Sequence, residues 1–240
     1  MVIEKCPPTC HKTAGFATRT SPDSKRLAER RPRRVGCTIV PGKSIIRPVQ
    51  GQDAAGVAAV YAPNVTDTVI SFETEPPDAA EMARRIEATV AAHPWLVCER
   101  AGEIVGYAYA SSHNGRAAYR WSVNVTVYID RRLHRSGIGR ALYTSLFALL
   151  RLQGFYNAYA GITLPNAGSV GLHEAMGFQP VGVYREVGCK FGAWHDVGWW
   201  SLELQPRPAN QPPVPLTPAQ LAALPCYQEA GEAGTPLLRV

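Results

Sequence analysis

Hydrophobic and polar residues follow a helical period in some segments of the chain and a strand-like alternation in others. A helical period of three to four residues predicts helices over 53–61, 78–92, 137–152 and 166–177, with a weaker one over 219–223. Alternating or continuous apolar runs predict strands over 44–48, 95–99, 104–110, 119–130, 156–162, 179–189 and 197–204. Because strands and helices interleave and hairpins stand toward both ends, we expect a three-layer α/β domain around a mixed, mostly antiparallel sheet.

Capping and turn residues mark the expected ends of several elements. Asp53 and Asp78 can each accept a hydrogen bond from the first turn of a helix, whereas Pro94 and Gly154 end helical patterns. Residues 100–103 have the composition of a hairpin turn. The stretch 69–77 alternates at first and is then interrupted by two prolines.

The charge of the chain is divided unevenly. The 240 residues are 46% hydrophobic, enough for one substantial core, and carry a formal net charge of +6. Residues 1–47 carry 11 Lys and Arg against 3 Asp and Glu, whereas residues 48–240 carry 14 against 16. We therefore expect a disordered basic arm over 1–43, a folded domain over 44–204 and a Pro-rich tail over 205–240. No run of 18 apolar residues indicates a membrane span.

The basic arm is open to three interpretations: a transit peptide, a nucleic-acid-binding arm, or a solvated extension without a role of its own. Its only aromatic residue is Phe16, so it does not resemble a module that stacks on bases. Cys6, Cys10 and His11 have no second pair of ligands nearby in sequence, and we expect no metal site. The first twenty residues have no apolar core, so we expect no secretory signal and reduced thiols in a cytoplasmic protein.

The segment from Val125 to Ala141 carries the clearest candidate chemistry. A strand-like run ends at Ile129, a basic turn follows, and Gly137 and Gly139 open an apolar helix. Because the glycines carry no side chains, several amide N–H groups can converge on one anion, and the helix N-terminus adds partial positive charge. Full charges surround the same point: Arg131, Arg132, His134, Arg135 and Arg140. A pyrophosphate is the expected ligand.

The spacing of these glycines argues against two common phosphate-binding motifs. The three-glycine spacing of a dinucleotide site is absent, because Arg140 stands where a third glycine could begin, and no Gly-Lys-Ser/Thr of a P-loop follows. A plain strand–helix turn stays open as an alternative. The run 135–140, Arg-Ser-Gly-Ile-Gly-Arg, resembles the Arg/Gln-x-x-Gly-x-Gly/Ala signature of the GNAT superfamily of acetyl-CoA-dependent N-acetyltransferases.

Further stretches resemble one branch of that superfamily. Residues 164–178 are similar to its C-terminal motif Asn-x-x-Ala/Ser-x-x-Leu-Tyr-Glu-x-x-Gly-Phe, with His173 in place of the tyrosine. The runs 72–76 and 190–199, with the aromatic positions within 119–128, resemble the phosphinothricin and methionine sulfoximine N-acetyltransferases. The resemblance covers about 45–204 and leaves both tails outside it.

The resemblance implies direct transfer of acetyl from acetyl-CoA to the α-amine of a small amino-acid-like acceptor, without an acyl-enzyme, in a homodimer. It also implies a GNAT fold, in which two neighbouring strands splay apart and the pantetheine arm inserts between them. By resemblance, the cofactor-binding residues are Val127, Tyr128, Ile129, Arg135, Ser136, Gly137, Ile138, Gly139, Arg140 and Asn166. The substrate-binding residues are Phe72, Arg116, Tyr119 and Tyr128, with Arg116 holding the anionic head of the acceptor.

Asn124 departs from the family at a position that matters for mechanism. The family places a glutamate base there, and an amide cannot accept a proton near neutral pH. Glu75 and His173 are the candidates for proton transfer, so the predicted catalytic set is His173, Asn124 and Glu75. Two alternatives stay open. One is an acetyl-CoA-binding GNAT protein with another amine acceptor or weak activity, and the other is a nucleic-acid- or partner-binding protein that works through the basic arm.

Overall fold

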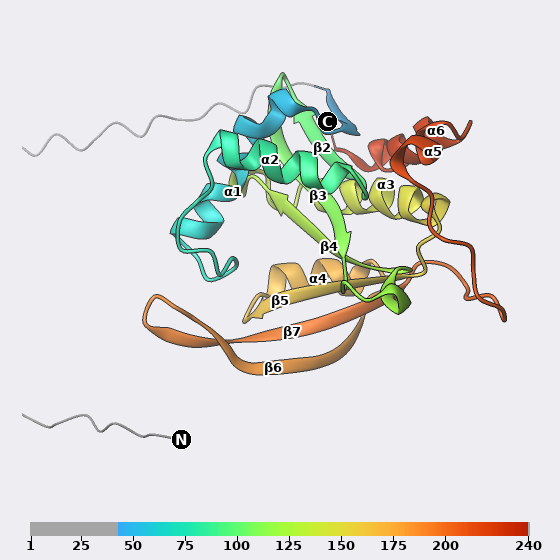
Figure 1. Ribbon diagram of the computed structural model, residues 1–240. Coiled ribbons are helices and arrows are strands. Elements are labelled where there is room, and N and C mark those ends of the chain that lie inside the picture. Colours follow the sequence, from blue (N-terminus) through green and yellow to red (C-terminus); the bar gives the residue numbers. More distant parts are fainter. Residues whose placement is uncertain (1–42, 240) are drawn as a thin grey trace, which may run out of the picture. The chain divides into compact units, whose positions relative to one another are not determined.

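The structure, a computed structural model, describes residues 43–239 of the chain (Figure 1). The predictions made for residues 1–42, including the basic arm and the cluster at Cys6, lie outside the described residues. Within 43–239, no helix combines the length and apolar character needed to span a membrane.

The elements follow the order that the hydrophobic pattern predicts. The strands are β1 (Ser44–Pro48), β2 (Trp95–Arg100), β3 (Glu103–Ser112), β4 (Ser122–Ile129), β5 (Asn157–Leu164), β6 (Gln179–Lys190) and β7 (Ala193–Glu203). The helices are α1 (Ala54–Thr66), α2 (Ala79–Val90), α3 (Ile138–Gln153), α4 (Ala167–Ala175), α5 (Pro218–Ala222) and α6 (Tyr227–Glu232). Short 3-10 turns cover Gly51–Asp53, Ala117–Tyr119, Arg131–Leu133 and Thr235–Leu237.

The strands form one seven-stranded sheet in the order β1-β2-β3-β4-β5-β7-β6. Every neighbouring pair is antiparallel except β4 and β5, which are parallel because α3 connects them as a crossover. The mixed, mostly antiparallel sheet expected from the sequence is therefore confirmed.

Helices cover both faces of the sheet, which gives the expected three layers (Figure 1). On one face, α1 and α2 pack over β2 and β3 around a cluster that includes Val57, Ile86 and Tyr107. On the other face, α3 and α4 enclose a larger cluster that includes Leu146 and Phe178. Burying apolar surface on both faces stabilises the sheet and fixes the register of its strands.

One local expectation needs correction. Asp53 does not cap α1 with its side chain, because its carboxylate accepts hydrogen bonds from the Arg47 guanidinium at 2.7 and 2.8 Å. Arg47 thereby holds the pKa of this carboxyl below its usual range. The stretch 69–77, in which two prolines interrupt the alternation, forms a loop. By contrast, Asp78 caps α2 by accepting a hydrogen bond from Glu81 N at 2.7 Å, as expected.

The segment after β7 packs against the domain, which the sequence does not predict. The weak helix expected near 219–223 is α5, but α6 and the turn after it also form, and both lie beside α3 (Figure 1). Leu221 and Ala230 are buried, and Gly234 N donates a 2.9 Å hydrogen bond to Ser145 Oγ of α3. The proline-rich composition does not predict this packing, because only a few apolar side chains make the contact.

Candidate active site

β4 and β5 are neighbours in the sheet but pair along only part of their length. Residues 122–124 pair with 157–159, after which β4 pairs only with β3 and β5 only with β7. The backbone groups of 125–129 that face β5 therefore have no strand partner. Such a wedge admits an extended ligand that satisfies these groups with its own hydrogen bonds. This is the splayed strand pair that the resemblance implies (Figure 1).

The turn after β4 has the backbone geometry of an anion site. Arg135 and Gly137 both have positive φ angles, of 63° and 89°. The first intrahelical bond of α3 runs from Ala141 N to Gly137 O, so the amides before Ala141 are free of helical partners. Ile138 is 1% exposed, so only its backbone can contact a ligand. The α3 N-terminus thus presents convergent N–H groups at the end of the wedge.

Only part of the charge around this turn is available to a ligand. Arg131 donates to Asp67 Oδ2 at 2.8 Å and to the Pro63 carbonyl, and Arg132 pairs with Asp130. Arg135 and Arg140 are exposed and form no ion pair within 43–239. Their charge at the N-terminus of α3 is therefore not neutralised by an ion pair within the described residues.

Gly139 and the motif around α4 fit together at the same place. A Cβ at Gly139 would lie 3.0 Å from Leu172 Cδ2, so a glycine allows α4 to approach α3 closely. Asn166 caps α4, because its Oδ1 accepts a 3.0 Å hydrogen bond from Ser169 N. These contacts place α4 on the β5 side of the wedge.

His173 of α4 is buried, with a relative exposure of 3%, and both of its ring nitrogens have partners. Nδ1 donates to the Ser169 carbonyl at 2.8 Å, so Nε2 accepts a 3.0 Å hydrogen bond from the Tyr143 hydroxyl. Tyr143 is itself fully buried, and Phe178 packs edge-on against the imidazole. Burial lowers the pKa of His173, despite the opposing hydrogen bond to Ser169. This arrangement keeps the imidazole neutral and fixed in one tautomer.

The point where β4 and β5 separate is occupied by a polar and aromatic group of side chains. Asn124 and Tyr159 are the last paired residues of the two strands. His113, just after β3, places Nδ1 2.9 Å from Asn124 Oδ1 and stacks on Tyr159 with ring centroids 4.3 Å apart. The Tyr119 and Trp199 rings lie 5.8 and 6.4 Å from the same imidazole.

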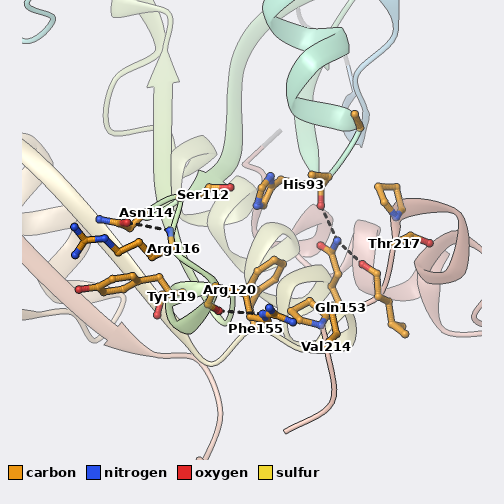
Figure 2. A pocket seen from close by; sticks show the side chains of 18 residues that line it. His93, Ser112, Asn114, Arg116, Tyr119, Arg120, Gln153, Phe155, Val214 and Thr217 are labelled. Atoms are coloured by element: carbon orange, nitrogen blue, oxygen red, sulfur yellow. Dashed lines mark hydrogen bonds between the residues drawn. The ribbon is translucent and has the colours of Figure 1, made fainter. Parts of the chain in front are cut away.

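Arg116 and Tyr119 lie on the connection between β3 and β4. This connection lines a cavity of about 410 Å³ together with residues 91–93 after α2, Gln153 and Phe155 at the end of α3, and residues 214–218 (Figure 2). Figure 2 shows the side chains of Arg116 and Tyr119 projecting to the same side, away from His93 and Gln153. Arg116 N donates to Asn114 Oδ1 at 3.2 Å, and the guanidinium is exposed. Through the Tyr119 ring, this loop adjoins His113.

Three other predicted site residues lie on the α1 and α2 side of the sheet. Tyr128 lines a cavity of about 330 Å³, whose wall includes the ion pair between Glu73 and Arg85. Burial raises the pKa of the Tyr128 phenol well above its usual value. Phe72 is 37% exposed and lies directly over Gly188 of β6. Glu75 is exposed in the loop before α2.

A comparison with known families assigns this architecture. The model of the acetyltransferase (GNAT) domain matches residues 46–199, well over half of the chain. The chain belongs to the GNAT acetyltransferase family. It is therefore an N-acetyltransferase that takes acetyl from acetyl-CoA and transfers it to an amine.

Individual GNAT proteins extend the comparison. A phosphinothricin N-acetyltransferase of Streptomyces viridochromogenes is 40% identical over 173 residues, which cover 72% of this chain and 93% of that protein. An L-methionine sulfoximine/L-methionine sulfone acetyltransferase of Pseudomonas paraeruginosa is 32% identical, covering 67% and 95%. The crystal structure of a phosphinothricin acetyltransferase from Sinorhizobium meliloti in complex with acetyl-CoA has a TM-score of 0.68 at 31% identity, covering 71% and 94%.

Within this GNAT domain, the predicted site residues fall into separate groups. The predicted cofactor residues lie along the open edge of β4 and at the start of α3, except Asn166, which caps α4. The predicted catalytic residues do not come together: Asn124 is at the separation point, His173 is buried under α4, and Glu75 is in an exposed loop. Their roles stay predictions. Sequence reasoning missed His113. The pairing of residue 111 with residue 124 on adjacent strands could have identified it, because residue 113 then lies on the same face as Asn124.

His173 should make the GNAT domain less stable in acid. Its folded pKa lies below the value of about 6.5 in the unfolded chain, so the unfolded state binds more protons between the two values. The stability contribution is complete above about pH 6.5 and is lost as the pH falls toward the folded pKa, by up to about 1.4 kcal/mol per pH unit.

The measurement is the free energy of unfolding in urea at several pH values. Below about pH 6.5 this free energy should fall less steeply with decreasing pH in His173→Gln than in the unmodified chain. His93, whose pKa burial also lowers, contributes in the same window, and His93→Phe measures its share. An unchanged slope in His173→Gln would contradict the prediction.

Proposed function

We propose that this enzyme acetylates the α-amine of a small amino acid with a phosphinothricin-like or methionine-sulfoximine-like side chain. The observation that carries the proposal is the 40% identity to a phosphinothricin N-acetyltransferase over 93% of that protein's length. The loop with Arg116 and Tyr119, beside the separation point of β4 and β5, supports it. A guanidinium can donate two parallel hydrogen bonds to a phosphinate or carboxylate, which suits such an acceptor.

In this proposal the pyrophosphate of acetyl-CoA binds at 135–140, on the free amides of α3 and the side chains of Arg135 and Arg140. The pantetheine arm lies along the unpaired edge of Val127, Tyr128 and Ile129, with Asn166 on the opposite side. The acetyl group then reaches the separation point, where the acceptor amine attacks it directly. No acyl-enzyme is required, because donor and acceptor meet in one ternary complex.

The main alternative is a GNAT enzyme with a different amine acceptor, or one with weak activity, because Asn124 replaces a glutamate base. We further propose a homodimer and a cytoplasmic location. A set of exposed apolar side chains on the β6–β7 hairpin supports the homodimer: Val181, Val183, Tyr184, Val187, Phe191 and Trp194. Trp200, by contrast, is buried in the domain core.

The test is CoA release with a panel of acceptors: phosphinothricin, methionine sulfoximine, methionine sulfone, glutamate and methionine. We expect kcat/KM for the first three to exceed that for the last two by at least tenfold. Arg116→Gln should raise KM for phosphinothricin by about 10- to 100-fold, the cost of losing a charged hydrogen-bond donor. Arg120→Gln is the matched control, because its side chain turns back to the Ala117 carbonyl of the same loop.

Two results would contradict the proposal. CoA release with none of the five acceptors would exclude the amino-acid class, and equal KM changes in both arginine variants would exclude recognition by Arg116. A chain without residues 1–43 tests the remaining alternative, a protein that binds nucleic acid or a partner through its basic arm. If its turnover is unchanged, the basic arm has no part in catalysis, whereas loss of salt-sensitive DNA binding would favour a nucleic-acid-binding arm.

A further inference from the structure

His113 and Asn124 form a connected pair on one face of the sheet. Ser111 of β3 is in register with Asn124 of β4, and His113 follows two residues later, so it lies on the same face by the alternation of a strand. His113 N also donates to the Ser122 carbonyl at 3.4 Å, which continues the ladder past the end of β3. The imidazole is thereby held diagonally across from the amide of Asn124.

The contact between the two side chains sets the tautomer of the imidazole. Asn124 Oδ1 carries only lone pairs, so His113 Nδ1 must carry the hydrogen of the 2.9 Å bond. Nε2 then retains its lone pair and can accept a proton. Stacking on Tyr159, together with the Tyr119 and Trp199 rings, restricts the rotation of the imidazole while leaving it only half-buried. Among these neighbours, the titratable groups are the phenols of Tyr119 and Tyr159.

The pair lies where the reacting atoms must meet. The anion site is at the C-terminal end of β4, and the wedge narrows toward Asn124 and Tyr159, where strand pairing begins. A CoA thioester bound by its pyrophosphate at the wide end therefore directs its acetyl group toward the narrow end. His113 is the histidine at that point, whereas the ring of His173 is enclosed by Tyr143, Ser169 and Phe178.

We propose that His113 is the general base of this acetyltransferase and that Asn124 is its positioning residue. This role rests on the proposed acetylation of an amino-acid amine. Nε2 of His113 takes one proton from the acceptor ammonium and passes it to solvent. The neutral nitrogen forms a bond to the thioester carbonyl carbon. The tetrahedral intermediate then loses a second proton from nitrogen, its C–S bond breaks, and the sulfur leaves as a thiolate that is protonated to the CoA thiol. The products are the acetylated amine, CoA and one proton in solution.

This assignment explains why an amide at position 124 is compatible with activity. A carboxylate there could serve as the base itself, but an asparagine can orient another base without being charged. The contact with Asn124 uses only Nδ1, so Nε2 of the imidazole is left to face the acceptor amine, as a general base must. Asn124 therefore acts through His113, and its replacement should lower kcat more than it changes KM.

The first test compares His113→Gln and His113→Phe with the unmodified chain. We expect kcat to fall by about 10²- to 10³-fold, the usual contribution of a general base, with little change in KM. His113→Phe keeps an aromatic ring on Tyr159, so it controls for lost packing, and both variants should retain the thermal protection given by acetyl-CoA. Arg84→Gln is the control for an unrelated substitution, because its exposed guanidinium pairs with Glu81 on the surface of α2. Its kcat should be unchanged.

The second test distinguishes chemistry from structure. Free imidazole should restore turnover in His113→Ala in proportion to its concentration, and it should not do so in an Asn166→Ala variant. Asn124→Asp places a carboxylate beside Nδ1, which favours the imidazolium. The acid limb of its kcat profile should therefore move to higher pH, whereas Asn124→Ala should lower kcat and leave KM unchanged.

The outcomes separate this proposal from the proposed function. Turnover in the unmodified chain that persists in His113→Gln would overturn only the role of His113. No CoA release from the unmodified chain with any amino acid would overturn the proposed function and this role with it. Asn124→Glu gives a last discrimination. A tenfold or greater rise in kcat would mean that the native site lacks an effective base and would overturn the proposal, whereas no rise supports it.

Discussion

Replacing Arg135 and Arg140 together by glutamine should weaken acetyl-CoA binding by about two orders of magnitude. Both arginines are exposed at the N-terminus of α3 and form no ion pair within the described part of the chain, so their charge is free for a pyrophosphate. Each charged hydrogen bond contributes roughly 1.5–3 kcal/mol to binding, so the loss of two such bonds weakens the affinity for acetyl-CoA by at least about 100-fold. The backbone amides remain, so binding is weakened and not abolished.

The measurement is thermal protection by acetyl-CoA. At a ligand concentration of 100 times Kd, the unmodified protein gains about 2.7 kcal/mol, and a 100-fold weaker variant gains only about 0.4 kcal/mol. Arg84→Gln with Arg207→Gln removes the same charge from exposed sites distant in sequence from the α3 turn, and it should keep the full protection. Equal protection in both double variants would show that α3 does not bind the pyrophosphate through these side chains.

Ending the chain at Pro208 should lower the free energy of unfolding by about 4 kcal/mol. The deletion uncovers the surface beneath Leu221 and Ala230, and burying one large apolar side chain is worth about 1.5–3 kcal/mol. It also removes the Leu216 carbonyl, which accepts from the buried Gln153 amide at 2.9 Å, and the partner of Ser145. Since domains of this kind are stable by only about 5–15 kcal/mol, the loss should be visible in a urea titration.

A pair of glycine variants tests the same contact without deleting residues. A Cβ at Gly234 would collide with the carbonyl of Ala141 in α3, whereas a Cβ at Gly231 would meet open space. Gly234→Ala should therefore destabilise the protein, and Gly231→Ala should be neutral or stabilising by up to about 1 kcal/mol, as expected for alanine in a helix. Equal midpoints for the two variants, or an unchanged midpoint after truncation, would show that the C-terminal segment does not stabilise α3.

The candidate site was only partly accessible to sequence reasoning. The turn at 135–140 could be predicted because glycine spacing, charge and the start of an apolar helix are all local features. His173 and Phe178 stand in one family motif, but the bond from Tyr143 to His173 depends on a contact between residues 30 positions apart. His113 carries no motif of its own. Its relation to Asn124 arises only when β3 and β4 pair, because strand register brings residues 11 positions apart within hydrogen-bond distance.

By itself the sequence determined the order of helices and strands, the mixed sheet and the glycine turn at 135–140, since apolar period, caps and glycines act over a few residues. Only the tertiary structure decided where strand pairing stops between β4 and β5, and which arginines are already paired with acids. It also decided that 209–239 covers α3, and that His113, not Glu75, stands beside Asn124. These features depend on pairing and packing between distant segments, which composition and local period do not encode.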